Sequence, residues 1–550
     1  MRALRILDLS SPKDGGRVSS CAIATCALLV AASHLSGCAH DPRARATNVP
    51  PKVQTIDEVV EAVAERYRLP GIAVGVIWEG EVIYAQGKGE LEAGTGQVIT
   101  QNSVFKIASI SKQMTTALLA RLVDSGKLRW DDPVTKHIPT FRMSDPWVTR
   151  EMQVRDLLIH NSGLRAGAGD LMLWPEPNLF TREDIISGLE HLQPIHSFRT
   201  RYTYDNLLYV VAGEVAAAAG GASYEELIRR ELFGPLGMTR CRVGEWNREE
   251  VGEVAQPHMR KGQGNTVIRR DEAIIPAITS AAAGGIRCSL HDMLIWMRTW
   301  LDPELKPPSG ESWLSAEQRN AIWTAQMPLP VSQRHRDWFD TRFSAYGFGW
   351  RLSDMDGTFT AGHTGTLAGM FSAMVLVPEQ RHGFVFHING DGGEARVVLS
   401  TMLTKLLTAP KELMSVEHYA EAIAAEASTL PSERVAPDTS LRRPAVRSAL
   451  VRRLGIYRDP WFGEVSLCDA NGDRVHFHAA KSPRMAGEVM QVDERLLVDW
   501  FDESISAESW ITFAEVESNP ITFRMAKVDP EEDFSYDYED LLFTRVGECP

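Results

Sequence analysis

The chain has 550 residues, of which 44% are hydrophobic and 24% are charged, and this ordinary globular composition excludes a mostly disordered chain, a collagen-like chain and a polytopic membrane protein. Its formal charge of −14, without any basic run, disfavours nucleic-acid binding, which needs clustered Lys and Arg. Seven cysteines in a chain of this length also exclude a small disulfide scaffold.

The first 37 residues are predicted to be a targeting segment and not part of the fold. Basic residues precede an apolar stretch at 21–33, which is too short to span a bilayer but fits the apolar region of a secretory signal. The sequence Leu-Ser-Gly-Cys ending at Cys38 resembles a bacterial lipobox, so we expect Cys38 to be lipidated and residues 38–55 to form a tether. A plain signal peptide cut near the same place is the alternative. Either reading predicts export to the periplasm or cell envelope, and under the lipobox reading the lipid on Cys38 is the only membrane contact.

Residues 56–410 show strands at both ends and helices between them. A helical pattern at 56–68 precedes two β-rich runs, 72–78 and 81–86, which are predicted to form a hairpin around Glu79 and Gly80. Further helices are predicted at 110–125, 207–219 and 224–234, and further strands at 371–377 and 384–388. This order indicates an α+β fold in which the first and last strands share one sheet.

The chain changes character after this region. Residues 411–449 contain an amphipathic helix at 416–427 and a linker rich in Pro, Arg and Ser. From 450 to 550 the pattern is short strands, with a hairpin signal at Asn471-Gly472, so a separate β-rich domain is predicted. Four cysteines remain after the predicted leader and Cys38, and sequence spacing leaves their pairing open: Cys241, Cys288, Cys468 and Cys549.

A Ser-x-x-Lys pattern opens the helix at 110–125. Ser109 and Lys112 are one helical turn apart and therefore share a face. A serine hydroxyl needs a base within hydrogen-bond reach, and a lysine can serve if desolvation makes it release its proton. The same pattern occurs at Ser10–Lys13 and Ser103–Lys106, so by itself it carries little information.

Two further motifs change this assessment. Tyr204-Asp205-Asn206 precedes a predicted helix, and His363-Thr364-Gly365 precedes a predicted strand. The three motifs in this order resemble the serine β-lactamase and penicillin-binding-protein superfamily, closest to the branch of class C β-lactamases, D-aminopeptidases and esterases. The flanking segments 122–134, 157–164 and 235–238 also resemble that family, and the likeness extends over about 56–408.

The resemblance implies a role for each motif residue. Ser109 would form the acyl-enzyme, Lys112 and Tyr204 would form the base network, and Asn206 would position a substrate amide or the Lys112 ammonium. The alternative for Tyr204 is a buried aromatic residue, for Asn206 a helix cap, and for His363 a loop histidine. The remaining implied roles concern the third motif: the backbone N–H groups of Ser109 and Thr366 form the oxyanion hole, while His363, Thr364 and Gly365 line the opposite wall.

The third motif also bears on the substrate. His363 stands where β-lactamases and D,D-carboxypeptidases usually have Lys, and a histidine that is mostly neutral near pH 7 is a weaker anchor for a carboxylate. This departure favours a peptidase or amidase of the D-aminopeptidase or penicillin-binding type over a β-lactamase or D,D-carboxypeptidase. The motifs are also compatible with a carboxylesterase and, less well, with a non-catalytic envelope-binding protein. The expected substrate is a small peptide, amide, ester or lactam.

No cofactor or metal is expected, because His476 and His478 form the nearest metal-like pattern and lack a completing ligand. The resemblance extends to 450–550, which is similar to the lipocalin-like β-barrel module appended to some of these hydrolases. This region carries 10 basic and 21 acidic residues, a net charge of −11. It is interpreted either as a solvated acidic surface or as a domain that shapes the cleft and disfavours anionic substrates.

Overall fold

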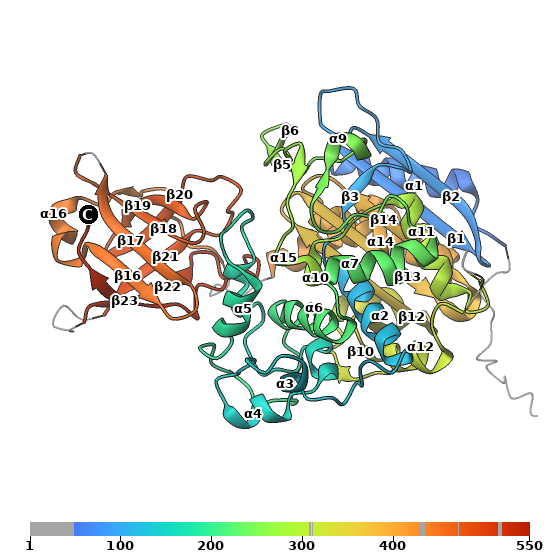
Figure 1. The fold of residues 1–550 in the computed structure, drawn as a ribbon. Coiled ribbons are helices and arrows are strands. Elements are labelled where there is room, and N and C mark those ends of the chain that lie inside the picture. Colours follow the sequence, from blue (N-terminus) through green and yellow to red (C-terminus); the bar gives the residue numbers. More distant parts are fainter. Residues whose placement is uncertain (1–48, 307–309, 311, 430–434, 471, 515–519) are drawn as a thin grey trace, which may run out of the picture. The chain divides into compact units, whose positions relative to one another are not determined.

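The computed structural model describes residues 49–306, 310, 312–429, 435–470, 472–514 and 520–550 (Figure 1). The predicted leader and the predicted lipidation site Cys38 lie outside these residues, as does Asn471 at the tip of the predicted hairpin. Among the described residues no single helix is long and apolar enough to cross a membrane, although one bent pair, Leu207–Gly220 with Tyr224–Leu236, meets the length and composition criteria.

An antiparallel sheet of eight strands is the centre of the larger domain, in the order β2-β1-β14-β13-β12-β11-β10-β9. In Figure 1 the blue strands from the chain start lie beside β14 from near residue 385. The prediction that the two ends of this region share one sheet is therefore confirmed. The strands are β1 (Gly71–Trp78), β2 (Glu81–Gly89), β9 (Met327–Pro328), β10 (Ser344–Tyr346), β11 (Arg351–Met355), β12 (Thr358–Leu367), β13 (Met370–Val377) and β14 (His382–Ile388).

Helices cover both faces of this sheet. All eight residues of β1 are buried, which explains why the strand reads as a continuous apolar run instead of an alternating one. One face packs against α1 (Val53–Arg66), α14 (Gly393–Thr408) and α15 (Val416–Ser428). The other face packs against α11 (Leu290–Leu301), and Gly75 lets the α11 side chain of Leu294 approach β1 closely.

A mostly helical region lies between β2 and β9. Its central helix is α2, which is buried on nearly every side from Ser111 to Ala120. The predicted helix at 224–234 is present, with one π-helical turn at Arg229–Phe233 between α7 and α8. The helices of this region and its border are α2 (Ser111–Asp124), α3 (Val134–His137), α4 (Pro146–Glu151), α5 (Arg182–Gly188), α6 (Leu207–Gly220), α7 (Tyr224–Ile228), α8 (Gly234–Leu236), α9 (Arg248–Val251), α10 (Ala281–Gly284), α12 (Ala316–Ile322) and α13 (Gln333–Phe339). The short strands are β3 (Val104–Lys106), β4 (Trp246–Asn247), β5 (His258–Lys261), β6 (Gly264–Val267), β7 (Ile274–Ile275) and β8 (Arg287–Ser289).

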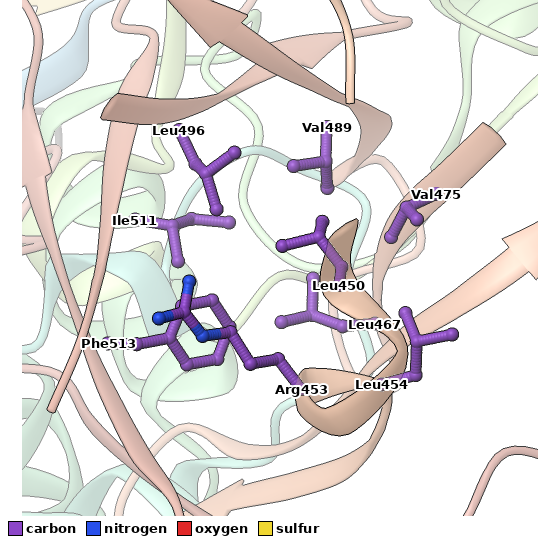
Figure 2. A pocket seen from close by; sticks show the side chains of 9 residues that line it. All are labelled: Leu450, Arg453, Leu454, Leu467, Val475, Val489, Leu496, Ile511 and Phe513. Carbon is purple, nitrogen blue, oxygen red and sulfur yellow. The ribbon is translucent and has the colours of Figure 1, made fainter. Parts of the chain in front are cut away.

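The C-terminal part is a β-barrel that closes where β19 pairs with β20. Its interior is filled by apolar side chains and leaves a cavity of only about 10 Å³, large enough for no more than one water molecule (Figure 2). The barrel is preceded by α16 (Arg447–Leu450) and the short strand β15 (Arg443–Pro444), which lie within or beside the predicted linker. The barrel strands are β16 (Gly455–Asp459), β17 (Gly463–Ala470), β18 (Arg474–Ala479), β19 (Ala486–Val492), β20 (Arg495–Trp500), β21 (Ser509–Phe513), β22 (Thr522–Lys527) and β23 (Leu542–Gly547).

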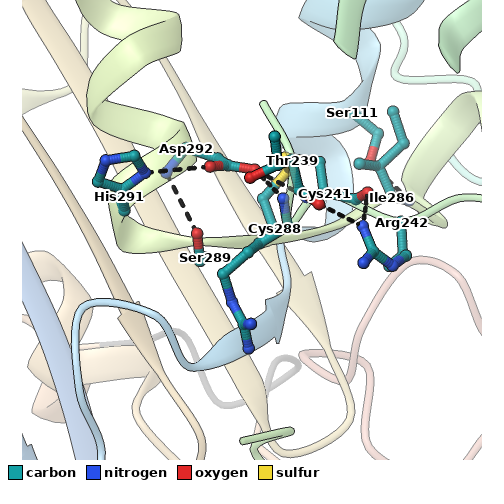
Figure 3. Close-up of a disulfide and its surroundings, with 10 residues drawn as sticks. Ser111, Thr239, Cys241, Arg242, Ile286, Cys288, Ser289, His291 and Asp292 are labelled. Carbon is teal, nitrogen blue, oxygen red and sulfur yellow. Dashed lines mark hydrogen bonds and ion pairs between the residues drawn. A yellow bond between two sulfur atoms is a disulfide. The ribbon is translucent and has the colours of Figure 1, made fainter. Parts of the chain in front are cut away.

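Two disulfides resolve the pairing that sequence spacing left open: Cys241–Cys288 in the larger domain and Cys468–Cys549 in the barrel. The first holds the chain near residue 241 against β8 (Figure 3). Beside it the buried carboxylate of Asp292 accepts hydrogen bonds from the backbone N–H groups of Arg240 at 2.6 Å and Cys241 at 2.8 Å. This arrangement fixes the segment that follows α8 to the start of α11.

Candidate active site

Ser109 lies in a tight turn between β3 and α2. Ala108 just before it has a φ of 49°, an uncommon value for a residue with a side chain, and the 3₁₀ turn Ala108–Ile110 then leads into α2. Its neighbours Ala108 and Ile110 are buried, whereas Ser109 is partly exposed. The turn therefore presents one hydroxyl to solvent at the N-terminal end of a buried helix.

Lys112 follows Ser109 by one helical turn and is fully buried. Its Nζ lies 3.1 Å from Ser109 Oγ, 2.7 Å from Asn206 Oδ1 and 2.8 Å from the carbonyl oxygen of Ala283. A neutral amine has two N–H groups and one lone pair. Because the amide and carbonyl oxygens can only accept, they take both N–H groups and leave the lone pair facing the Ser109 hydroxyl. Burial lowers the pKa of Lys112 to about 7, so a large fraction of the amine is neutral near physiological pH.

Tyr204 stands on the other side of the same amino group. Lys112 Nζ lies 4.8 Å from the centre of the Tyr204 ring and 5.1 Å from that of Tyr209. Burial raises the pKa of Tyr204 well above its usual value, and interaction with the Ser109 hydroxyl opposes this only in part. The phenol is therefore protonated at neutral pH, so of the two groups Lys112 is able to accept a proton and Tyr204 is able to donate one.

Asn206 precedes the first residue of α6 but its side chain makes no capping hydrogen bond, so the helix-cap alternative is wrong. The side chain instead bridges two titratable groups. Its Oδ1 accepts from Lys112, and its Nδ2 donates to the fully buried carboxylate of Asp170 at 2.7 Å. The start of α6 thus supplies a fixed hydrogen-bond acceptor for the Lys112 amine.

His363 lies on β12, buried, and is not a loop histidine. Its Nδ1 is 2.7 Å from the carbonyl oxygen of Thr364 and therefore carries the proton, which leaves Nε2 to accept from the Tyr346 hydroxyl at 2.9 Å. Burial, together with the positive charges of Arg351 and Lys112, holds the pKa of His363 well below its usual value. A neutral His363 supplies no positive charge to a substrate carboxylate.

Gly365 allows β12 to pass directly beside the nucleophile turn. A Cβ at this position would lie 2.3 Å from the carbonyl oxygen of Ile107 and 2.3 Å from Ser372 Oγ, closer than any side chain tolerates. The next residue, Thr366, is exposed and binds Arg396 through its hydroxyl, and strand alternation directs Thr364 to the same side. The β12 backbone itself, and no intervening side chain, therefore lies next to the turn that carries Ser109.

The structure also places residues at this site that sequence reasoning did not single out. His160 has a φ of 59°, accepts the Asp205 backbone N–H at 3.0 Å and lies 4.2 Å from Tyr204 between ring centres. Arg351 on β11 is exposed and lies 5.8 Å from the Tyr202 ring centre. A family-like segment at 157–164 contains His160 and could have indicated it, whereas Asp170, Tyr346 and Arg351 stand in no recognisable pattern. His476 and His478 lie on the less buried face of β18 in the barrel.

Comparison with known proteins agrees with the motifs. The family model described as Beta-lactamase matches residues 56–408. Penicillin-binding protein 4 of Amycolatopsis lactamdurans is 27% identical over 362 residues, covering 64% of this chain and 88% of that protein. The unguisins hydrolase ungD' of Aspergillus campestris is 26% identical over 355 residues, and this chain spans less than two thirds of its length, 62% of each protein.

Among solved structures, the octameric penicillin-binding protein homologue from Pyrococcus abyssi is similar in fold. Its TM-score is 0.56 at 20% identity, and the match covers 90% of this chain and 100% of that one. At this identity the likeness concerns the fold alone. Because the match covers 90% of this chain, it includes more than the 56–408 region.

Proposed function

This chain belongs to the Beta-lactamase family and is a serine hydrolase of the penicillin-binding-protein and β-lactamase type, and from that premise we propose that it is a peptidase or amidase acting through an acyl-enzyme on Ser109. The observation that carries the proposal is the set of partners around Lys112, which leaves its lone pair facing the Ser109 hydroxyl.

In the proposed reaction, Lys112 Nζ takes the proton of the Ser109 hydroxyl while Oγ bonds to the substrate carbonyl carbon. The carbonyl oxygen becomes an oxyanion, held by the backbone N–H groups of Ser109 and Thr366. The proton then passes from the Lys112 ammonium, directly or through the Tyr204 hydroxyl, to the leaving amine as its bond to the carbonyl carbon breaks. In the second half of the reaction Lys112 takes a proton from water while the water oxygen bonds to the acyl carbon. The proton then passes to Ser109 Oγ as the bond between Oγ and the acyl carbon breaks, which releases the acid and restores the hydroxyl.

A second candidate, a β-lactamase or D,D-carboxypeptidase acting on carboxylate-bearing substrates, is favoured by Arg351. Its guanidinium lies 5.8 Å from the Tyr202 ring centre and 5.9 Å from that of Tyr346, whose hydroxyl binds His363. It can supply the cation that His363 lacks. The names of the relatives, one penicillin-binding and one a hydrolase of unguisins, are compatible with either candidate.

A substrate panel separates these functions. We expect purified protein to cleave D-amino-acid amides or short peptides, with little turnover of nitrocefin, and turnover of nitrocefin alone would favour the second candidate. Simple esters test for a carboxylesterase that uses the same base network. A protein that cleaves none of the three classes and takes no covalent label would leave only the non-catalytic binding role.

Arg351→Ala is expected to raise KM for a substrate with a free carboxylate by about 10- to 100-fold, the effect of losing one hydrogen bond to a charged group. The KM for the same substrate with that carboxylate amidated should stay unchanged. Arg342→Ala is the matched control, because Arg342 is exposed and pairs with Asp340. Equal effects of Arg351→Ala on both substrates would contradict carboxylate recognition by Arg351.

We also propose that the chain is exported and anchored by lipid on Cys38. The two disulfides support this, because such bonds persist in oxidising compartments. Mass spectrometry of the mature protein is expected to find a diacylglycerol-modified N-terminal Cys38, sensitive to Cys38→Ser. An unmodified mature N-terminus elsewhere would contradict the anchor.

A further inference from the structure

A segment of the C-terminal domain, residues 533–538, contacts the catalytic residues. The ring centre of Phe534 is 5.6 Å from that of Tyr204 in an edge-on arrangement. Asp537 Oδ2 accepts the backbone N–H of Gly169 at 2.7 Å. The backbone of the two parts is so close that a Cβ on Gly167 would lie 2.5 Å from the carbonyl oxygen of Phe534. The segment therefore contacts the loop 167–169, which directly precedes Asp170.

Asp170 links this segment to the catalytic amine. Its Oδ2 accepts two hydrogen bonds, from Asn206 Nδ2 at 2.7 Å and from Ser535 Oγ at 2.8 Å. Both of these bonds are donated to Oδ2, so Asn206 presents its NH₂ group to Asp170 and thereby turns its Oδ1 toward Lys112. The direction of the Lys112 lone pair depends on the orientation of Asn206. Asp170, which accepts a hydrogen bond from Ser535, fixes that orientation.

We propose that Asp170 and Ser535 are positioning residues of this enzyme, through which the C-terminal domain completes the catalytic centre by fixing Asn206 against Lys112. The inference rests on the proposed function of Ser109 and Lys112. It also assigns a second role to the acidic domain beyond a solvated surface. The relay runs from Ser535 through Asp170 and Asn206 to Lys112, with each step a single hydrogen bond.

The electrostatic interactions predict the direction in which loss of the relay shifts the pKa of Lys112. Burial raises the pKa of Asp170 well above its usual value, and the hydrogen bonds from Asn206 and Ser535 oppose that rise. Ionised Asp170 in turn raises the pKa of Lys112, against the larger lowering by burial. Removing the Ser535 hydroxyl makes Asp170 hold its proton more tightly, which reduces the negative charge beside Lys112 and lowers the Lys112 pKa.

Further titratable and charged groups face Lys112 and Asp170 and remain in place in the variants below. They come from α6 and the residues before it, from the segment after Leu158, from β11 and β12, and from the C-terminal domain. They are Tyr204, Asp205, Tyr209, His160, Arg351, His363 and Asp537. None of them is replaced in Ser535→Ala, and none of them connects Ser535 to Lys112 by the hydrogen bonds of the relay.

The test is the pKa of Lys112 in Ser535→Ala. It is measured by an NMR titration of protein whose lysines are labelled at Cε, and the Lys112 signal is assigned by its loss in Lys112→Arg. We expect a pKa below that of the wild type, an acid limb of kcat/KM shifted to lower pH by the same amount, and about a 5-fold lower plateau from one lost hydrogen bond. Asp170→Asn should shift the pKa further in the same direction. Ser506→Ala is the matched control, because Ser506 donates to Glu532 and not to Asp170.

A Lys112 pKa in Ser535→Ala equal to or above the wild-type value would overturn the relay. Because the NMR titration does not depend on turnover, it decides the inference even if the substrate panel and covalent labelling fail. Conversely, an active enzyme with an unshifted Lys112 in both variants would leave the proposed function standing and remove the relay alone. Unfolding temperatures of the variants exclude a trivial loss of fold.

Discussion

Ser109→Ala is expected to lower kcat/KM by at least about 10⁴-fold and to abolish covalent labelling by a fluorophosphonate or a fluorescent penicillin. Ser109 is the partly exposed hydroxyl within hydrogen-bond distance of Lys112, and without it no acyl bond can form. Intact-mass spectrometry of protein quenched during turnover measures the missing adduct directly.

The control for this substitution comes from the chain itself. Ser103 opens a second Ser-x-x-Lys pattern, but its hydroxyl accepts the backbone N–H of Thr100 at 2.9 Å and lies in no contact with Lys112 or Asn206 among the described residues. Ser103→Ala should keep labelling and turnover near wild type. Labelling that persists in Ser109→Ala would contradict the assignment of the nucleophile.

Lys112→Arg is expected to lower kcat/KM by about 10³-fold or more, although the positive charge is kept. A guanidinium does not release its proton in a protein, so it cannot accept the proton of Ser109. The wild-type enzyme should show an acid limb in kcat/KM with an apparent pKa of about 7, because the amine must be neutral and is protonated below that value. Stopped-flow acylation across pH measures this limb.

Lys106→Arg is the matched variant, since Lys106 ends β3 and belongs to the pattern that begins at Ser103. Its turnover and its acid limb should resemble those of the wild type. If Lys112→Arg retains wild-type acylation, or if its acid limb is unchanged, then Lys112 is not the base and Tyr204 would have to take that role.

Sequence patterns predicted the parts of the fold that local chemistry determines. The hairpin at Glu79 and Gly80 is formed as expected, with φ values of 51° and 87° that suit a tight two-residue turn. The C-terminal glycine of α2, Gly126, has a φ of 70°. The helix predicted at 224–234 is formed, but its π-helical turn at Arg229–Phe233 was not predicted, because the sequence carries no Pro or Gly signal at Arg229 where the hydrogen-bond register changes.

In the candidate site, too, some residues could be predicted from local sequence patterns and others could not. Ser109, Lys112, Asn206 and His363 stand in motifs with recognisable spacing. Asp170 and Ser535 do not, because they are 365 residues apart and meet only through the contact between the barrel and the loop before η3 (Asp170–Met172). Such a contact depends on tertiary packing, which no local pattern reports.

The pairing of β1 with β14 also constrains how this protein comes to be folded. Ile72 lies opposite Ile388, so the first strand of the sheet waits for more than 300 residues of chain before its partner exists. Pairings between residues so far apart in sequence are slow to form and leave apolar strands open to wrong partners in the interval. A nascent chain released before β14 would hold a complete Ser109–Lys112 motif but would lack the strand that joins β1 to β13. Catalytic competence in this molecule is therefore a late event of synthesis, acquired only when the last strands have arrived.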